Sequence, residues 1–172
     1  NQLAALPMPS PGSQTIPGLA NAMKIPAAVP AAVTNSATAG SSGKFRINLT
    51  SERGAKPTYR VGEFLSMTLA ISGSGTAYCY YEDATRNTAR IFPNQFRPDS
   101  SMRAGATERL PSGGFKIKFD RPGLERVACI AADRELVIPS GLKGSRDLMP
   151  LPVGSVNDVV GQFKQTNPGA ES

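Results

Sequence analysis

Residues 76–83 place large side chains on both faces of one expected β-strand, and this feature constrains the fold more than any other. Tyr78 and Tyr80 fall on one face, while Cys79 and Tyr81 fall on the other, because successive side chains of a strand point to opposite sides of the sheet. A strand with two substantial faces needs a packing layer on each side. We therefore expect this strand to be central.

Alternation of apolar and polar residues predicts the rest of a β-sheet domain over residues 44–139. In the expected strand 115–119, for example, Phe115, Ile117 and Phe119 share the inward face. Short strands separated by Gly- and Pro-containing turns favour an antiparallel β-sandwich. Residues 93–114 are a longer and polar stretch. The other expected strands are 45–50, 64–72, 88–92 and 125–132.

Residues 140–172 are expected to form an irregular tail that contains one short amphipathic helix at about 155–164. Ser155 and Asp158 form a pattern resembling a capping box. The helix would pack on the sandwich or cover an open sheet edge, and docking on a partner is the alternative. Residues 165–172 are expected to be frayed. The apolar stripe at helical spacing consists of Val156, Val159, Val160 and Phe163.

The N-terminal residues 1–43 differ sharply in composition from the rest and are expected to be a long extended segment. They contain no Asp or Glu, and Lys24 is their single charge. Repeated prolines break helices and remove backbone donors, and so little apolar surface cannot offset the cost of ordering the chain. One hypothesis is a flexible tether. The other is a segment that lies extended on a partner through small apolar clusters, with Leu3, Leu6, Met8, Met23 and Ile25 as the partner-binding residues.

The two cysteines, Cys79 and Cys129, each lie in the apolar part of an expected strand. An even count in a chain that looks exported favours a disulfide between neighbouring strands. Two buried free thiols are the alternative. A zinc site is not expected, because the chain has no His and no CxxC pair.

The remaining composition argues against catalysis, cofactors and nucleic-acid binding. Without histidine the chain cannot form a Ser-His-Asp triad, and neither cysteine has an evident base. Glu82 and Asp83 are adjacent in a strand end, so they point to opposite faces, and we interpret them as solvated turn residues. The net charge of +6 is spread along expected strand faces, as at Lys116 and Lys118, without a groove-reading motif.

The order of short motifs over roughly residues 45–135 resembles the bacterial family catalogued as domain of unknown function 4384. The resemblance implies a compact β-rich module without an established catalytic role. Such modules are appended to peptidase-like or kinase-like domains, or carried by exported and envelope proteins. Gly62 and Gly105 are expected at turns with positive φ. The residues that carry the resemblance are 59–63, 77–81, 91–94, 104–105, 110–111, Phe115, 122–123 and 127–131.

These observations predict a non-catalytic, exported structural or accessory subunit of a bacterial cell-envelope assembly, such as a secretion, pilus or flagellar apparatus. Its partners would be other protein subunits, bound through the N-terminal segment. We expect a periplasmic or outer-membrane location, with a membrane tether through a removed N-terminal or lipoprotein signal, since the sequence begins at Asn1. The alternative is a glycan- or peptidoglycan-binding module that uses the aromatic residues Tyr78, Tyr80 or Phe96. A hydrolase dependent on Glu82 or Asp83 ranks last.

Overall fold

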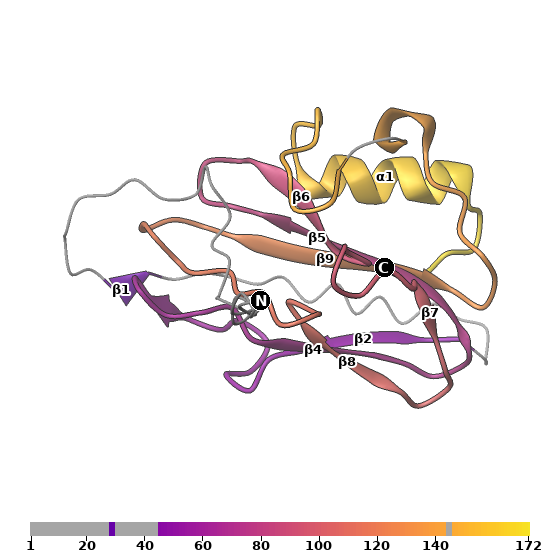
Figure 1. Ribbon diagram of the computed structural model, residues 1–172, viewed down its shortest axis with the longest axis horizontal. Coiled ribbons are helices and arrows are strands. Elements are labelled where there is room, and N and C mark those ends of the chain that lie inside the picture. Colours follow the sequence, from indigo (N-terminus) through magenta and orange to yellow (C-terminus); the bar gives the residue numbers. More distant parts are fainter. Residues whose placement is uncertain (1–27, 30–44, 144–145) are drawn as a thin grey trace, which may run out of the picture.

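The computed structural model describes residues 28–29, 45–143 and 146–172 of the chain. Antiparallel strands dominate this part and one short α-helix lies near its C-terminal end, which confirms the expected mainly β class (Figure 1). The helical elements are the 3-10 turn η1 (Ser140–Leu142) and α1 (Val156–Thr166). The strands are β1 (Ala28–Val29), β2 (Ile47–Thr50), β3 (Tyr59–Arg60), β4 (Met67–Ile71), β5 (Gly75–Glu82), β6 (Thr88–Phe92), β7 (Ser101–Met102), β8 (Thr107–Leu110) and β9 (Arg126–Ala132).

Two main sheets pack face to face. The first has the order β2-β4-β8. In the second, β5 pairs with β6 and β7 along one edge and with β9 along the other, from Thr76↔Ala132 to Glu82↔Arg126. Figure 1 shows α1 across the outer face of this second sheet, with β2, β4 and β8 on its opposite side. The described domain is therefore a sandwich of two sheets with a helix as a third layer.

Strand β5 is buried on both faces, as its sequence predicts. Cys79 and Tyr81 belong to the core between the two sheets, together with apolar side chains of β4, β6, β8 and β9. Tyr78 and Tyr80 belong to a second core, which lies between the sheet and the helix. Each face of the strand thus faces a different layer, which explains why neither face is polar.

Helix α1 begins where the sequence predicts and ends two residues later than expected. The Ser155 hydroxyl accepts a hydrogen bond from the Asp158 backbone N–H at 3.2 Å, which satisfies one of the otherwise unpaired donors of the first turn. Val156, Val159 and Phe163 are buried against the sheet. The stripe therefore packs on the sandwich, and the helix belongs to the same packed unit as the strands. Leu136 and Leu142, on either side of residue 139, lie in one buried cluster with Val159.

Two glycines of the resemblance have the backbone conformation that was expected of them, and a third is required for another reason. Gly62 and Gly105 have φ values of 96° and 71°. Residues other than glycine rarely adopt such positive φ values. Gly75 allows close approach of two strands instead. A Cβ atom on it would lie 1.9 Å from the carbonyl oxygen of Ala132, so only glycine lets β5 start against the end of β9.

Residues 93–114, a longer polar stretch in the sequence, contain the two strands β7 and β8. Strand β8 pairs with β4 in register from Met67↔Leu110 to Ala70↔Thr107. Of its four residues only Leu110 is buried, since β8 is the last strand of its sheet. Such a strand carries too little apolar alternation to be recognised before its partner is known.

At 115–119 the predicted inward-facing side chains are confirmed, but the backbone does not form the predicted strand. Phe115, Ile117 and Phe119 are buried. Their backbone makes only scattered bonds to the preceding segment, with an isolated bridge at Phe64↔Lys118. The period-two burial of a strand can therefore arise from an extended segment without a continuous ladder.

The C-terminal residues expected to be frayed are held against the sheet. Glu171 and Ala131 exchange two backbone hydrogen bonds, with N···O distances of 2.8 and 2.9 Å. Ala170 is also buried against the helix layer. The last residues of the chain are few and polar, so their sequence has no periodicity that predicts this pairing. The pairing depends on the free edge of β9, which is distant in the sequence.

Candidate functional site

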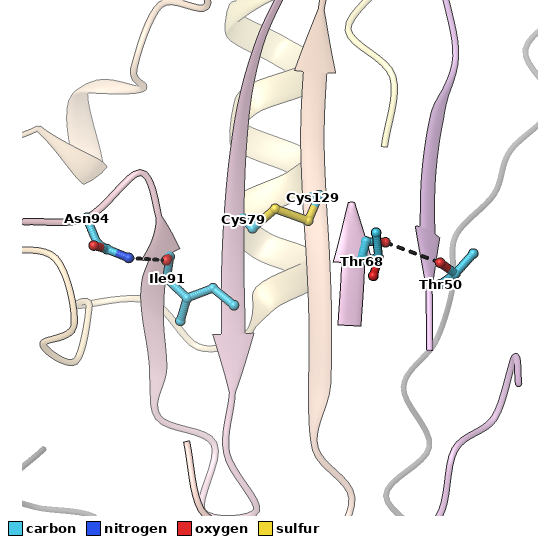
Figure 2. Close-up of a disulfide and its surroundings, with 6 residues drawn as sticks. All are labelled: Thr50, Thr68, Cys79, Ile91, Asn94 and Cys129. Carbon is cyan, nitrogen blue, oxygen red and sulfur yellow. Dashed lines mark hydrogen bonds between the residues drawn. A yellow bond between two sulfur atoms is a disulfide. The ribbon is translucent and has the colours of Figure 1, made fainter. Parts of the chain in front are cut away.

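The two cysteines face each other across β5 and β9. Cys79 and Cys129 occupy directly opposite positions in the register, with their Cα atoms 4.0 Å apart and their sulfurs bonded, as Figure 2 shows. The alternative of two free thiols is thereby excluded, and the predicted disulfide is confirmed. The bond joins two neighbouring strands at the centre of the sheet. Because the two cysteines are 50 residues apart in the sequence, it closes a loop of about fifty residues.

The three aromatic residues proposed as a ligand surface do not form one. Tyr78 and Tyr80 lie beneath α1, with ring centroids 5.6 and 5.9 Å from that of Phe163. Burial raises the pKa of the Tyr80 hydroxyl above its ordinary range. Phe96 is 44% exposed and stacks on Phe115 in a different part of the domain. The packing layer that the sequence predicts on this face of β5 is α1, which covers both tyrosines.

Glu82 and Asp83 are buried, which corrects their interpretation as solvated turn residues. The Glu82 side chain has no exposed surface and lies between the two arginines Arg86 and Arg126, at 2.7 and 2.9 Å. Its other oxygen accepts the backbone N–H of Val156 at 2.9 Å. Burial alone would raise the pKa of this carboxyl, but these bonds and charges hold it below its ordinary value.

Glu82 is therefore the group that fastens the N-terminal end of α1 to the central strand. A carboxylate at the first turn also interacts favourably with the helix dipole. Asp83 has a different role, since its carboxylate accepts hydrogen bonds from Thr85 and Asn87 and closes the β5–β6 turn. No sequence pattern joins residue 82 to residue 156, so sequence reasoning had no means of finding this contact.

A second buried carboxylate, Glu125, pairs with Tyr81. The Tyr81 hydroxyl donates a hydrogen bond to Glu125 inside the domain, where Glu125 is only 4% exposed. Burial, together with the negative charges of Asp83 and Asp120, raises the pKa of Glu125 to about 7, although the Tyr81 bond and Arg121 act in the opposite direction. The carboxyl is therefore an acid that changes charge near neutral pH.

We expect the stability of the protein to decrease as the pH rises from about 4.5 to about 7. The folded state binds the Glu125 proton more tightly than the unfolded chain, so this proton stabilises the fold at low pH and the advantage is lost above the raised pKa. The variant Glu125→Gln keeps the Tyr81 acceptor without the charge. In urea titrations at pH 8 it should exceed the wild type by about 3 kcal/mol, at ~1.4 kcal/mol per pKa unit.

The matched control for this measurement is Glu135→Gln, which changes an exposed carboxylate. It should follow the wild type at every pH. Equal stability of Glu125→Gln and the wild type at pH 8 would show that Glu125 is not held in a charge-disfavouring environment.

The edges of the two sheets leave a slot between β2 and β9, which we call the β2–β9 slot. It is a cavity of about 60 Å³. Helix α1 borders it from the other layer. Its lining includes Ile47, Leu49, Val127, Cys129, Asn157 and Val160. The slot is mainly apolar, and the backbone of an edge strand forms part of its wall.

One part of the N-terminal segment is described, and it pairs with the domain. In β1, Ala28 and Val29 lie opposite Arg60 and Tyr59 of β3 in an antiparallel register. The β3 region is fixed in turn by Glu63, which accepts hydrogen bonds from the Arg60 backbone N–H and from the Arg53 guanidinium. The segment thus meets the domain through backbone pairing. The predicted partner-binding residues Leu3, Leu6, Met8, Met23 and Ile25 lie outside the described residues.

Neither a metal cluster nor a spanning helix is found in the described part of the chain. Over residues 28–29, 45–143 and 146–172, no three His, Cys, Asp or Glu side chains gather as a metal site would require. The one α-helix there is too short and too polar to cross a membrane.

The sequence comparison yields one family. Residues 58–135 match the model of a family described as Domain of unknown function (DUF4384), which confirms the resemblance. The match runs from β3 through β9 and leaves out β2, α1 and the N-terminal segment. No curated protein and no solved structure matches the chain.

Proposed function

We propose that this protein, whose sandwich resembles domain of unknown function 4384, is a non-catalytic structural or accessory subunit of a bacterial cell-envelope assembly. Secretion, pilus and flagellar systems are the assemblies we have in mind. In this proposal the N-terminal segment binds neighbouring subunits, and the sandwich serves as a spacer or decoration.

The observation that carries the proposal is the pairing of Ala28–Val29 with β3. These two short strands form a sheet of their own. Their pairing supports a segment that binds in extended form, a mode in which main-chain hydrogen bonds provide affinity and alternate side chains provide specificity. The segment's small apolar clusters, such as Met23 and Ile25, are suited to shallow pockets beside such a strand.

The disulfide supports export. Cross-links of this kind persist in oxidising compartments such as the bacterial periplasm and are rare in the cytosol. The bond between Cys79 and Cys129 lies in the core between the two sheets. We therefore place the protein in the periplasm or at the outer membrane, with a lipid or membrane tether supplied by an N-terminal signal.

The buried carboxylates support a non-catalytic role, because each is used in holding the fold. Glu82 joins β5 to α1, Asp83 closes a turn, and Glu125 accepts the Tyr81 hydroxyl. The hydrolase hypothesis needed Glu82 or Asp83 to be free to act on a substrate. Of the three aromatic residues of the glycan-binding hypothesis, Tyr78 and Tyr80 are buried beneath the helix, and Phe96 is the one with an exposed ring.

A deletion of residues 1–27 in the native host tests the proposal while keeping Ala28–Val29 in place. After cross-linking in cells, the full chain should capture envelope proteins, and the deletion variant should lose at least nine-tenths of them. A variant that carries a Gly/Ser sequence of equal length in place of residues 1–27 is the matched control, and it should also lose them. If the deletion variant captures the same partners as the full chain, the N-terminal segment is not the binding element and the proposal is wrong.

A further inference from the structure

The segment 120–125 leads into β9 and lies beside the β5–β6 turn. It is fixed at both ends. Before it, the backbone N–H and C=O of Phe119 bond to residues 62–63, with N···O distances of 3.0 and 2.8 Å. After it, Arg126 begins the pairing of β9 with β5, opposite Glu82. Between these points the backbone of the segment makes no hydrogen bond to any described residue, so its position depends on side chains and packing.

One hydrogen bond and a tight contact hold the segment against the rest of the domain. The Tyr81 hydroxyl donates to the Glu125 carboxyl, and no other hydrogen bond or ion pair joins the segment to the part of the chain that the structure describes. A Cβ atom on Gly123 would lie 2.5 Å from the Cβ of Ala84, so the segment lies directly on the turn there. Leu124 is 41% exposed and adds little burial.

The Glu125 carboxyl has no compensating cation. It is 4% exposed, and its one partner is the neutral hydroxyl of Tyr81 on β5. Asp83 of the turn and Asp120 of the segment itself add negative charge around it, while Arg121 is exposed and forms no ion pair with it. A buried carboxyl in such surroundings is disfavoured in its ionised form. The single fastening of the segment is therefore a group that is stable there only with its proton.

We propose that the segment 120–125 is a pH-sensitive latch, which is closed on the β5–β6 turn while Glu125 is protonated and opens once this carboxyl loses its proton. A carboxylate regains its full hydration only outside the domain, and the segment has no second hydrogen bond that opposes its release. The fixed positions of Phe119 and Arg126 confine the movement to the residues between them. Because the pKa of Glu125 is about 7, the change falls at neutral pH.

The elements beside the latch keep their own interactions when it opens. The Asp83 carboxylate accepts hydrogen bonds from Thr85 and Asn87 within the turn, so the turn does not need the segment. Tyr81 faces the core between the two sheets, and the adjacent residue Glu82 faces the helix layer. The contacts that fasten α1 are therefore on the other side of the sheet, and we expect the opening to be local.

Nuclear Overhauser measurements on the full chain, labelled with ¹³C, test the latch. The contact between the Ala84 methyl group and the Hα atoms of Gly123 reports the closed form through protons that do not exchange with water. We expect its intensity to fall about fivefold or more between pH 5.5 and pH 8, with a midpoint at about pH 7. The methyl contact between Ala77 and Ala131, which are opposite each other in β5 and β9, should stay constant and show that the domain remains folded.

Two variants and a matched control separate the latch from a general effect of pH. Glu125→Gln removes the charge and keeps an acceptor for Tyr81, so its Ala84–Gly123 contact should persist at pH 8. Gly123→Ala places a methyl group against Ala84 and should show the open form at both pH values. Glu135→Gln changes an exposed carboxylate and should respond to pH as the wild type does.

Three results overturn the proposal. The first is an Ala84–Gly123 contact that persists in the wild type at pH 8. The second is a contact that is lost at pH 8 in Glu125→Gln as well, while its Ala77–Ala131 contact remains. The third needs no variant: the ¹³C signal of the Glu125 carboxyl must titrate together with the contact, and a carboxyl that titrates in the ordinary range of glutamate, at about pH 4.3, leaves the latch without its trigger.

Discussion

Replacement of Glu82 by alanine is expected to lower the free energy of unfolding by about 3–5 kcal/mol, the cost of removing one partner from a buried ion pair. The change leaves the Arg126 guanidinium, which is 24% exposed, without its carboxylate, and the Val156 N–H without an acceptor. Urea denaturation at pH 7 measures the loss. Hydrogen exchange should show the first turn of α1 opening more readily than the strands.

Two further variants make the Glu82 experiment specific. Glu52→Ala removes a carboxylate that is 81% exposed and 3.9 Å from its arginine, so it should cost less than ~1 kcal/mol. If Glu82→Ala costs no more than Glu52→Ala, the buried network is not a determinant of stability. Because the pKa of Glu82 is held below its ordinary value, its contribution is present above about pH 4.5 and declines as the pH falls further. Glu82→Ala should therefore lose less stability than the wild type in acid.

Reduction of the disulfide is expected to cost about 4 kcal/mol, the loop-closure entropy of a loop of about fifty residues. The bond restricts the unfolded chain by joining Cys79 to Cys129, while the sheet pairing of β5 and β9 remains available without it. Urea titrations of the wild type with and without reductant, with reduction verified by mass, measure the difference.

A double variant serves as the control for the disulfide. Cys79→Ala with Cys129→Ala should show no response to reductant and should be at least as unstable as the reduced wild type, since it also loses two buried sulfurs. A midpoint that does not move when the wild type is reduced would mean that the unfolded chain is not constrained by this bond.

Opposite pH responses of two buried carboxylates set the expected stability optimum. Glu82 contributes fully only above about pH 4.5, whereas Glu125 begins to cost stability as the pH rises toward its pKa of about 7. The wild type should therefore be most stable near pH 5. The sequence shows both residues as ordinary glutamates at strand ends, and their environments come from Arg126, Val156 and Tyr81.

Features that depend on neighbours in the sequence were predictable. The central position of β5 follows from its two apolar faces, and α1 follows from a capping residue and an apolar stripe. The pairing of Cys79 with Cys129 follows from two apolar strands and an even cysteine count. Strand β8 was missed because only one of its residues is buried, so its sequence shows no apolar alternation. Its backbone pairing with β4 is what makes it a strand.

The mainly β class, the central strand, the cysteine pair and the apolar face of the helix follow from the amino-acid sequence alone, because each depends on local periodicity and residue type. Three further features become visible only in the folded chain: α1 covers Tyr78 and Tyr80, Glu82 reaches Val156, and Glu171 pairs with Ala131. These features join residues that are 40 or more positions apart in most cases. Long-range packing places them together, and no local preference of the chain encodes which edge or face a distant segment will cover.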